Sequence, residues 1–281
     1  MKNKFYKWLF TAPVIIYSLL LILAPLVYIF VISFFKSDSY GGMEYVFTLG
    51  NYIQLFNMVY LRIFMQSIII ALIVTFICIL IAYPFVLAIS HKNAKMQKIF
   101  ITLVMIPFLT NSLIRMYGFV VLLRKSGVVN TLLMGFGIIN NPLRLMYNNL
   151  GIIIGMVYTL LPFMILPLNS SVSSIDYKLL EAACDLGANK RQRFLNIILP
   201  ATKPALFNGS LMVFTPALGY FFIVDVLGGG KIMILGNLIK NQFLTARNWP
   251  FGAAISVFLL LITFAIIGLY RRSGGKLEDL G

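Results

Sequence analysis

The chain is poor in the residues from which catalytic and metal sites are built. Its 281 residues include 8 Asp and Glu, one histidine and two cysteines. His91 lies in a short polar loop, and Cys78 and Cys184 have no cysteine or histidine neighbour at metal-ligand spacing. We therefore expect no catalytic residue, no metal site and no cofactor in this chain.

Charged residues are also scarce, which excludes a soluble protein. They make up 11% of the chain, hydrophobic residues make up 60%, and the mean hydropathy is +0.93. A soluble domain is nearer a quarter charged and half apolar. The net charge of +15 would suggest nucleic acid in a soluble protein. Here the basic residues mostly flank apolar segments, where they set topology and meet lipid headgroups, so we expect a bilayer and no nucleic acid as partner.

Six long apolar segments predict six transmembrane helices. They are 8–35, 64–90, 98–123, 150–172, 205–227 and 251–270. Their composition is continuously apolar and not alternating, which favours helices over a β-barrel. The first segment follows Lys2, Lys4 and Lys7 as a signal peptide would, but it is longer than the roughly 7–15 apolar residues of a signal. We expect it to be a retained span of a multi-pass protein.

The basic residues also predict which side of the membrane each loop faces. More of the 23 Lys and Arg fall on the side of the N-terminus and of the loops at 91–97 and 173–204 than on the other side. By the positive-inside rule that side is the cytoplasm, so both termini are expected there. The outer segments 36–63 and 124–149 are candidates for short re-entrant or interfacial helices.

These expectations define a domain organisation for the chain. It comprises a first helix with its outer loop (1–63), a transmembrane core (64–272) that contains a large cytoplasmic loop (173–204), and a cytoplasmic tail (273–281).

The large cytoplasmic loop carries an unusually ordered polar sequence. From Glu181 to Pro200 it reads E-A-A-C-D-L-G-A-N-K-R-Q-R-F-L-N-I-I-L-P. Asp176 is a plausible N-cap for a helix that runs to about Leu186, and Gly187 supplies the left-handed conformation that commonly stops a helix. A second short helix through Ile197 is expected to end near Pro200.

This helix–glycine–helix arrangement predicts a docking surface. Leu179, Ala183 and Leu186 fall on one helical face, and Ala182 beside them is small enough to allow close approach. A rim of basic residues follows at Lys190, Arg191 and Arg193. An apolar helix face with a charged rim suits binding in the groove of a partner protein.

The loop resembles a known element of ATP-driven importers. The order E-A-A, three residues, Gly, nine residues, I-x-L-P is similar to the loop through which membrane subunits of ATP-binding-cassette importers contact their ATPase. The topology places this loop independently in the cytoplasm, where ATP is available. The resemblance implies that the contact with the ATPase is made by Glu181, Ala182, Ala183, Gly187, Ile197 and Pro200.

Four further stretches extend the resemblance over nearly the whole chain. They are P-F-L-T-N-S-L-I-R at 107–115, L-L-P-F-M-I-L-P-L at 160–168, V-D-V-L-G-G-G-K-I-M-I-L-G-N-L-I-K at 224–240 and R-N-W-P-F-G-A-A at 247–254. Together they look like the PotB-type permeases of spermidine/putrescine importers. Such permeases carry tryptophan where this chain has Leu109 and aspartate where it has Asn248, which leaves the fine polyamine specificity open.

The resemblance implies a fold, a location and partners. The fold is all-α, with six transmembrane helices of the type I importer permease in the cytoplasmic membrane. The partners are a second permease, a cytoplasmic ATPase dimer that binds ATP and Mg, and an extracytoplasmic polyamine-binding protein. The chain itself lacks the phosphate-binding motif G-x-x-x-x-G-K-[ST], so ATP hydrolysis is expected on the separate ATPase.

One acidic residue is a candidate for the substrate pathway. Asp225 lies at the edge of a late span, where a carboxylate costs about 2.5–3.5 kcal/mol at the helix centre on insertion scales. We interpret it as a group that neutralises a substrate ammonium, with Tyr220 and either Tyr117 or Tyr158 offering ring faces. The alternative is an interfacial aspartate paired with Lys231 or Arg115. For Arg115 we expect snorkelling to headgroups, with gating or an ion pair as the alternative.

Three other functions remain open at this stage. The nearest is the same machine for another small solute, such as sulfate, thiamine or iron. A secondary transporter would usually show paired halves or ionisable relay residues within its spans. A membrane enzyme would need a nucleophile and a base, for which the chain has few candidates.

Overall fold

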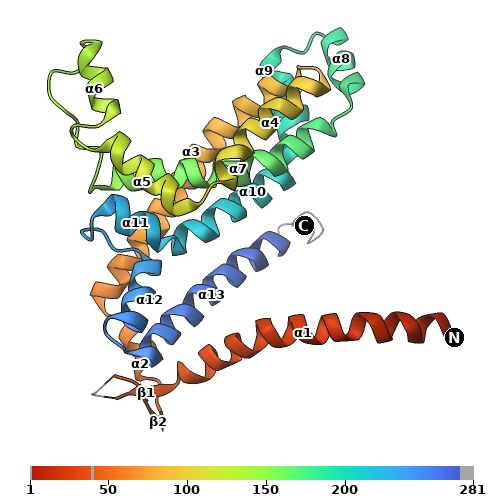
Figure 1. Cartoon of the computed structure of the whole chain (residues 1–281). Coiled ribbons are helices and arrows are strands. Elements are labelled where there is room, and N and C mark those ends of the chain that lie inside the picture. The colour runs from red at the N-terminus through yellow and green to blue at the C-terminus, as the bar shows by residue number, and fades with distance from the viewer. Residues whose placement is uncertain (1, 39–40, 273–281) are drawn as a thin grey trace. The chain divides into compact units, whose positions relative to one another are not determined.

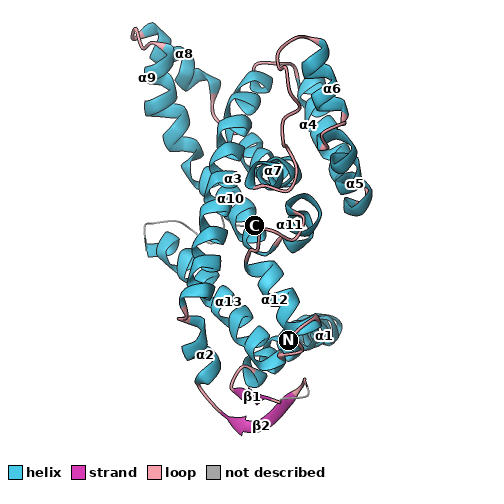
Figure 2. Cartoon of the chain, turned by 90° about the vertical axis from the view of Figure 1, so that its left-hand side faces the viewer, coloured by secondary structure: helices cyan, strands magenta, loops and turns pink. Residues whose placement is uncertain are grey.

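The computed structural model describes residues 2–38 and 41–272, and it is mostly helical (Figures 1 and 2). The chain divides into two compact units, one formed by 1–62 with 238–266 and the other by 63–237 with 267–281. The tail expected at 273–281 lies outside the described residues. The elements are α1 (Lys2–Ile32), β1 (Phe35–Ser37), β2 (Met43–Phe47), α2 (Gly50–Leu55), α3 (Met58–Ser90), α4 (Ala94–Leu109), α5 (Ser112–Leu123), α6 (Val128–Gly135), α7 (Asn149–Ser173), α8 (Tyr177–Asp185), α9 (Lys190–Arg193), a π-helix (Phe194–Ile198), α10 (Leu199–Gly219), α11 (Phe221–Gly228), α12 (Leu235–Leu244) and α13 (Trp249–Arg272).

The prediction of six membrane-spanning helical segments is confirmed for the described part of the chain. The segments that are long and apolar enough are Thr11–Ile32, Met58–Ser90, Ser112–Gly135, Asn149–Ser173, Lys190–Gly219 and Trp249–Gly268. Backbone amides and carbonyls have no water to bond in hydrocarbon, so a helix, which pairs them internally, is the form that these apolar runs adopt.

Two of the expected spans are interrupted, which the apolar pattern did not predict. The segment 98–123 is divided between α4 and α5, where Thr110 is extended (φ −78°, ψ 152°) and the Asn111 side chain accepts a hydrogen bond from the Leu113 amide at 2.8 Å. The segment 205–227 is divided at Tyr220 (φ −77°, ψ 58°), which separates α10 from α11. In both cases the sequence stays apolar on each side of the break, so the hydropathy pattern gives no sign that the helix is interrupted.

The first unit contains a small β-hairpin that the sequence interpretation missed (Figure 2). Strands β1 and β2 pair antiparallel, with Lys36 opposite Glu44 and an ion pair of 3.3 Å between their side chains. The Asn51 side chain donates to the carbonyls of Ser33 (2.9 Å) and Phe35 (2.8 Å) and so fixes the hairpin to α2. The outer segment 36–63 is therefore part strand and part helix.

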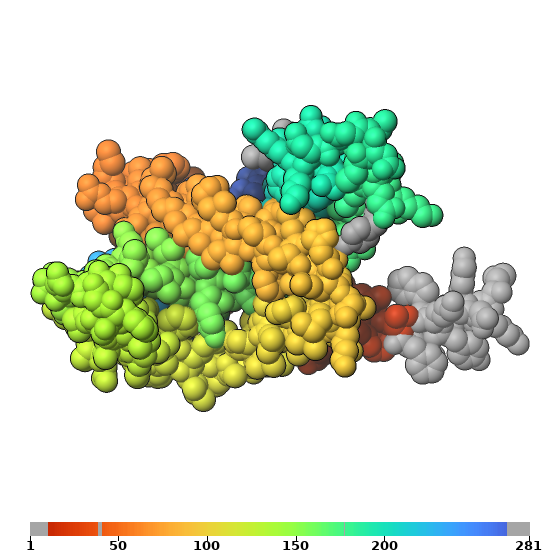
Figure 3. Space-filling view, turned by 90° about the horizontal axis from the view of Figure 1, so that it is seen from above, coloured from red at the N-terminus to blue at the C-terminus, as the bar shows by residue number. Residues whose placement is uncertain are grey.

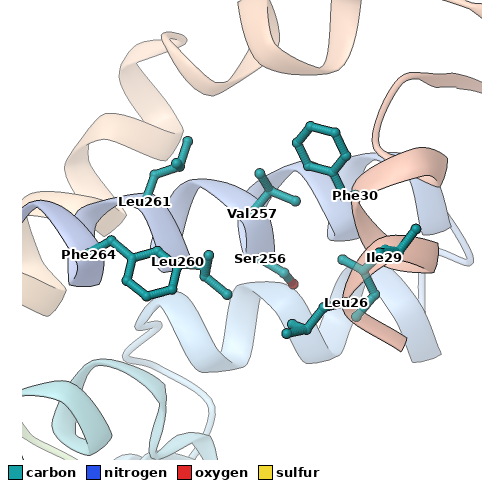
Figure 4. A pocket seen from close by; sticks show the side chains of 9 residues that line it. Leu26, Ile29, Phe30, Ser256, Val257, Leu260, Leu261 and Phe264 are labelled. Atoms are coloured by element: carbon teal, nitrogen blue, oxygen red, sulfur yellow. The ribbon is translucent and has the colours of Figure 1, made fainter. Parts of the chain in front are cut away.

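The same unit presents a broad apolar surface. Nearly all described side chains of α1 between residues 11 and 31 are exposed, and they are apolar all round the helix. A groove between α1 and α13 is lined by Leu26, Val27, Ile29, Phe30, Ser256, Val257, Leu260, Leu261 and Phe264 (Figure 4). A helix of this kind is stable only in apolar surroundings, as expected for a span in a bilayer.

The core of the second unit is built around α7. Gly209 of α10 lets that helix approach α7 closely, because a Cβ there would lie 2.8 Å from the Met164 sulfur. Gly155 of α7 does the same for α11, where its missing Cβ makes room for Ile223 and Leu227. Small residues at such contacts are the usual means by which membrane helices pack. The core therefore positions α10 and α11, the two elements that flank the break at Tyr220.

A glycine also sets the contact between α12 and the end of α10. A Cβ at Gly236 would overlap the carbonyl oxygen of Gly219 and lie 2.7 Å from its carbonyl carbon. Since these are backbone atoms, they cannot yield by a side-chain rotation. We expect Gly236→Ala to destabilise the protein by about 1–3 kcal/mol, as overpacking typically does.

Thermal unfolding of the detergent-solubilised protein checks this prediction. Gly118→Ala in α5 is the matched control, because a Cβ at Gly118 meets nothing within 4 Å. There alanine should raise helix stability by at most about 1 kcal/mol. Equal melting temperatures for the two variants would contradict the close approach of α12 to α10.

Candidate functional site

The first helix of the large loop has the ends that the sequence predicted. The Asp176 side chain accepts a hydrogen bond from the Lys178 amide at 3.0 Å and caps the start of α8. At the other end Gly187 has φ +80°, and its amide donates to the Cys184 carbonyl at 2.8 Å. The Ala188 amide donates to the Ala183 carbonyl at 2.9 Å, which completes a Schellman motif. The predicted N-cap and glycine stop are both confirmed.

The second helix begins with a capping box. Asn189 Oδ1 accepts from the Gln192 amide at 2.9 Å, and Gln192 Oε1 accepts from the Asn189 amide at 2.8 Å. The sequence carried this signal as N-x-x-Q directly after the glycine turn. Arg193 Nη1 donates to the Cys184 sulfur at 2.8 Å and ties α9 to α8. We call these two helices, Tyr177–Asp185 and Lys190–Arg193 with the turn between them, the elbow.

The prediction that Pro200 ends the second helix of the loop is wrong. Helix α9 passes into the π-helix that contains Ile197, and this continues into α10 with Pro200 in its first turn. In the π-helix the Leu199 amide donates to the Phe194 carbonyl, five residues back. Because proline has no backbone amide, one helical hydrogen bond is missing here, but the helix continues through it. The elbow is thus joined to the fifth span by one helical segment, Lys190–Gly219.

The elbow presents an exposed apolar face. It projects at one end of the second unit, seen as the teal lobe in the space-filling view (Figure 3). Leu179 is 58% exposed and Leu186 is 89% exposed, while Ala183 between them is half-buried. Glu181 and Ala182 are also exposed. Exposed leucines on one helix face are what an unoccupied protein-binding surface is expected to show.

The predicted basic rim is present in part. Lys190 and Arg191 are exposed, whereas Arg193 is half-buried and turned toward Cys184. Lys190 and Arg191 are therefore the rim residues that are free to meet a partner, and Arg193 holds the elbow together.

A buried contact connects the base of the elbow to the second span. Tyr83 of α3 hydrogen-bonds to the Thr202 hydroxyl of α10, and both side chains are buried. The ring of Tyr83 also meets Phe194 of the π-helix edge-on, with centroids 5.3 Å apart. The base of the elbow is thereby in contact with α3 as well as continuous with α10.

Asp225 lies on the face of α11 that is turned away from α7. Ile223 and Leu227 are fully buried, and both lie beside Gly155 of α7. Since each residue turns an α-helix by 100°, Asp225 lies on the opposite side. The carboxylate of Asp225 accepts a hydrogen bond from the side-chain amide of Asn237 at 2.6 Å. The same side-chain amide also donates to the Phe221 carbonyl at 3.2 Å. Asp225 therefore faces the start of α12.

The predicted tyrosines lie on α5, on α7 and at the break between α10 and α11. Tyr158 of α7 packs edge-on against Phe119 of α5, with ring centroids 4.9 Å apart. Tyr117 is 65% exposed and lies two residues from Phe119, so it points to a different side of α5. Tyr220 is the residue at the break between α10 and α11. The pathway residues predicted from the sequence thus belong to at least two separate surfaces.

The Arg115 side chain lies beside two aromatic rings. Its guanidinium carbon lies 5.9 Å from the ring centre of Phe108 and 6.0 Å from that of Tyr158. One guanidinium nitrogen donates to the Thr110 carbonyl at 3.1 Å. The sequence interpretation missed this cluster, because its members come from α4, α5 and α7.

The two positions at which the sequence departs from PotB-type permeases have different surroundings. Leu109 is 79% exposed at the end of α4. Asn248 precedes α13, and its side chain accepts from the Phe251 amide at 3.1 Å. An aspartate would make the same cap, so the change at Asn248 preserves the local structure.

Comparison with known proteins identifies the family. Residues 84–278 match the model for the binding-protein-dependent transport system inner membrane component. The chain belongs to this family. The match includes the elbow, the π-helix and both broken spans.

Individual relatives extend the likeness over the whole chain. The chain is 42% identical over 276 residues, 98% of its own length and 96% of the relative's, to the spermidine/putrescine transport system permease protein PotB of Haemophilus influenzae. It is 42% identical over 246 residues, 88% of this chain and 90% of the relative, to the protein of the same name from Escherichia coli. These relatives are named as permeases, so the chain is a transport component and not an enzyme.

A solved structure confirms the fold. A chain of the bacterial alginate ABC transporter, crystallised with its alginate-bound periplasmic protein, superimposes with a TM-score of 0.78 over 96% of both chains at 18% identity. The predicted helical fold of an importer permease is therefore confirmed, apart from the small β-hairpin, which was not predicted.

The left-handed turn of the elbow yields a direct test. We expect Gly187→Val to uncouple ATP hydrolysis from transport, because a β-branched residue at φ +80° forces a new backbone path between α8 and α9. A Cβ at this position meets nothing within 4 Å, so the change acts through the backbone alone. The measurements are substrate uptake, ATPase rate and membrane abundance of the variant in its complex.

Gly187→Asn is the matched control, since asparagine adopts the left-handed conformation more readily than other residues. It should retain most of the coupling. Normal uptake by the valine variant would refute the role of this turn.

Proposed function

We propose that this chain is one of two permease subunits of an ATP-driven polyamine importer. The observation that carries the proposal is the 42% identity over 98% of the chain to a spermidine/putrescine permease. The elbow supports the rest: its exposed leucines and small residues fit a groove on a cytoplasmic ATPase dimer, which binds ATP and Mg. Both termini and the elbow then lie in the cytoplasm, as the basic residues indicate. A polyamine-binding protein delivers the substrate from outside.

The proposed task of ATP is to control access to the path. A trivalent cation that enters a cell gains about 2.3 kcal/mol per charge per 100 mV, so roughly 7 kcal/mol at that potential. Entry of a polyamine is thus already favoured electrically. A permanently open pore would also dissipate other ions. Coupling the elbow to an ATPase allows the path to open only when a loaded binding protein is present.

The first test is the ATPase activity of the complete complex in nanodiscs. We expect the polyamine-loaded binding protein to stimulate hydrolysis, and the unloaded protein or one offered sulfate to stimulate it far less. Spermidine and putrescine are compared to determine preference. If hydrolysis is stimulated only when the binding protein is offered sulfate, the chain is still an importer subunit, but the proposed polyamine substrate is wrong. If no ATPase co-purifies, the importer proposal itself fails.

A second test addresses Asp225. We expect Asp225→Asn to lower polyamine uptake while the complex still assembles, because the substitution removes a negative charge and keeps the size of the side chain. Asn237→Ala is the control: it removes the amide that donates to Asp225 but leaves the carboxylate. Equal loss of uptake in both variants would assign Asp225 to the α11–α12 connection and not to the substrate, and unchanged uptake in Asp225→Asn would reject its role.

A further inference from the structure

Two points at which membrane helices lack a backbone hydrogen bond are joined to each other in the second unit. Pro84 of α3 and Pro204 of α10 each remove one helical bond, because proline has no amide to donate. Sharp bends in helices occur at such positions. Tyr83 directly precedes the first proline, and Thr202 lies two residues before the second. The hydrogen bond between their side chains therefore links the positions at which two different spans can bend.

The bond between these two side chains is buried, and its direction follows from the other partner of the threonine. Thr202 is fully buried and Tyr83 is 7% exposed. The Thr202 hydroxyl donates its only proton to the Ile198 carbonyl at 2.8 Å. We therefore assign the Tyr83 hydroxyl as the donor and the Thr202 oxygen as the acceptor of the bond between the helices. In a dry interior no water replaces such a bond when it breaks, so each side chain holds the other in position.

The ring of Tyr83 extends this link to the base of the elbow. Its centroid lies 5.3 Å from that of Phe194, the first residue of the π-helix, in an edge-on arrangement. Phe194 directly follows Arg193, which donates to the Cys184 sulfur of α8. A π-helix is an irregular turn that is frequent at functional sites. One side chain of α3 thus contacts the junction on both sides, the π-helix with its ring and α10 with its hydroxyl.

We propose that Tyr83 is a positioning residue that couples α3 to the elbow during ATP-driven transport. When the elbow is displaced, the ring and the hydroxyl make α3 follow the helical segment Lys190–Gly219, so that two spans change position together. By the same contact α3 restrains the elbow while no loaded binding protein is present. This inference rests on the proposed function, because it requires an ATPase that is bound at the elbow.

Two substitutions break the same hydrogen bond with different consequences for stability. Tyr83→Phe keeps the ring against Phe194, and the Thr202 proton keeps its acceptor at Ile198. Thr202→Val instead leaves the Tyr83 hydroxyl buried without its acceptor, which is the more destabilising change. We therefore expect a lower melting temperature for Thr202→Val than for Tyr83→Phe. The double variant should recover, because it leaves no buried donor unpaired.

The functional test uses the complete importer reconstituted in liposomes. We expect Tyr83→Phe, Thr202→Val and the double variant each to raise ATP hydrolysis without binding protein by about fivefold, the factor that one hydrogen bond of typical net strength represents. The three increases should be equal, because each variant breaks the same bond. Spermidine uptake per ATP should fall in the same three variants.

Two control variants keep the bond intact. Thr202→Ser retains the hydroxyl and should hydrolyse ATP as the wild type does. Tyr60→Phe is the matched control, since it makes the same substitution in the same helix. The Tyr60 hydroxyl accepts a hydrogen bond from the exposed side chain of Gln54 at 3.4 Å, far along the chain from the prolines.

The outcomes separate coupling from stability and from the choice of substrate. If hydrolysis and uptake follow the melting temperatures, with Thr202→Val impaired and Tyr83→Phe equal to wild type, the contact serves stability alone and the coupling role is overturned. That result would stand even where spermidine stimulates the wild type. Raised basal hydrolysis in the three variants of a complex that spermidine fails to stimulate would retain the coupling role and overturn the polyamine substrate. A wild-type complex without an ATPase would overturn both.

Discussion

Backbone hydrogen bonding in hydrocarbon is the constraint on which the rest of this structure depends. A helix that crosses a bilayer must pair its own amides and carbonyls, so any interruption needs other partners close by. Each interruption described here has them. At the α4–α5 break the Asn111 side chain caps the new helix, and the Thr110 hydroxyl and amide both reach the Pro107 carbonyl. After the Tyr220 break, Asn237 donates to the Phe221 carbonyl. These breaks are therefore stable features of the fold.

The same constraint explains how the elbow is joined to the membrane. A loop that passes force to a helix is most effective if no flexible segment intervenes. Here the capping box at Asn189 and the π-helix leave one helical segment that runs from Lys190 into α10. The π turn adds one residue to the helical repeat, and no non-helical residue separates it from α10, which contains Pro200. Tyr83 then connects this junction to α3, so the elbow is linked to two spans and not one.

Much of this architecture could be predicted from the sequence, and the limits have physical causes. Long apolar runs report burial in lipid, so the number of spans followed from composition. The ends of α8 were predictable because they depend on local effects: the Asp176 side chain caps a nearby amide, and Gly187 adopts a left-handed conformation. The break at Tyr220 was missed because Phe221, Phe222 and Ile223 keep the segment apolar, and hydropathy reports the surroundings of a chain and not its dihedral angles. The environment of Arg115 was missed because Phe108 and Tyr158 reach it from other helices.

The scarcity of acids constrains how such a protein can handle a polycation. A path lined by many carboxylates would bind a polyamine tightly and release it slowly, since each ion pair in a dry site is strong. Ring faces bind ammonium groups more weakly and without a fixed hydrogen-bond geometry. A path with few carboxylates is therefore better suited to releasing a polyamine than one lined by many. The net positive charge of the chain is compatible with cation import, because its basic residues mostly flank the apolar segments, where they set topology.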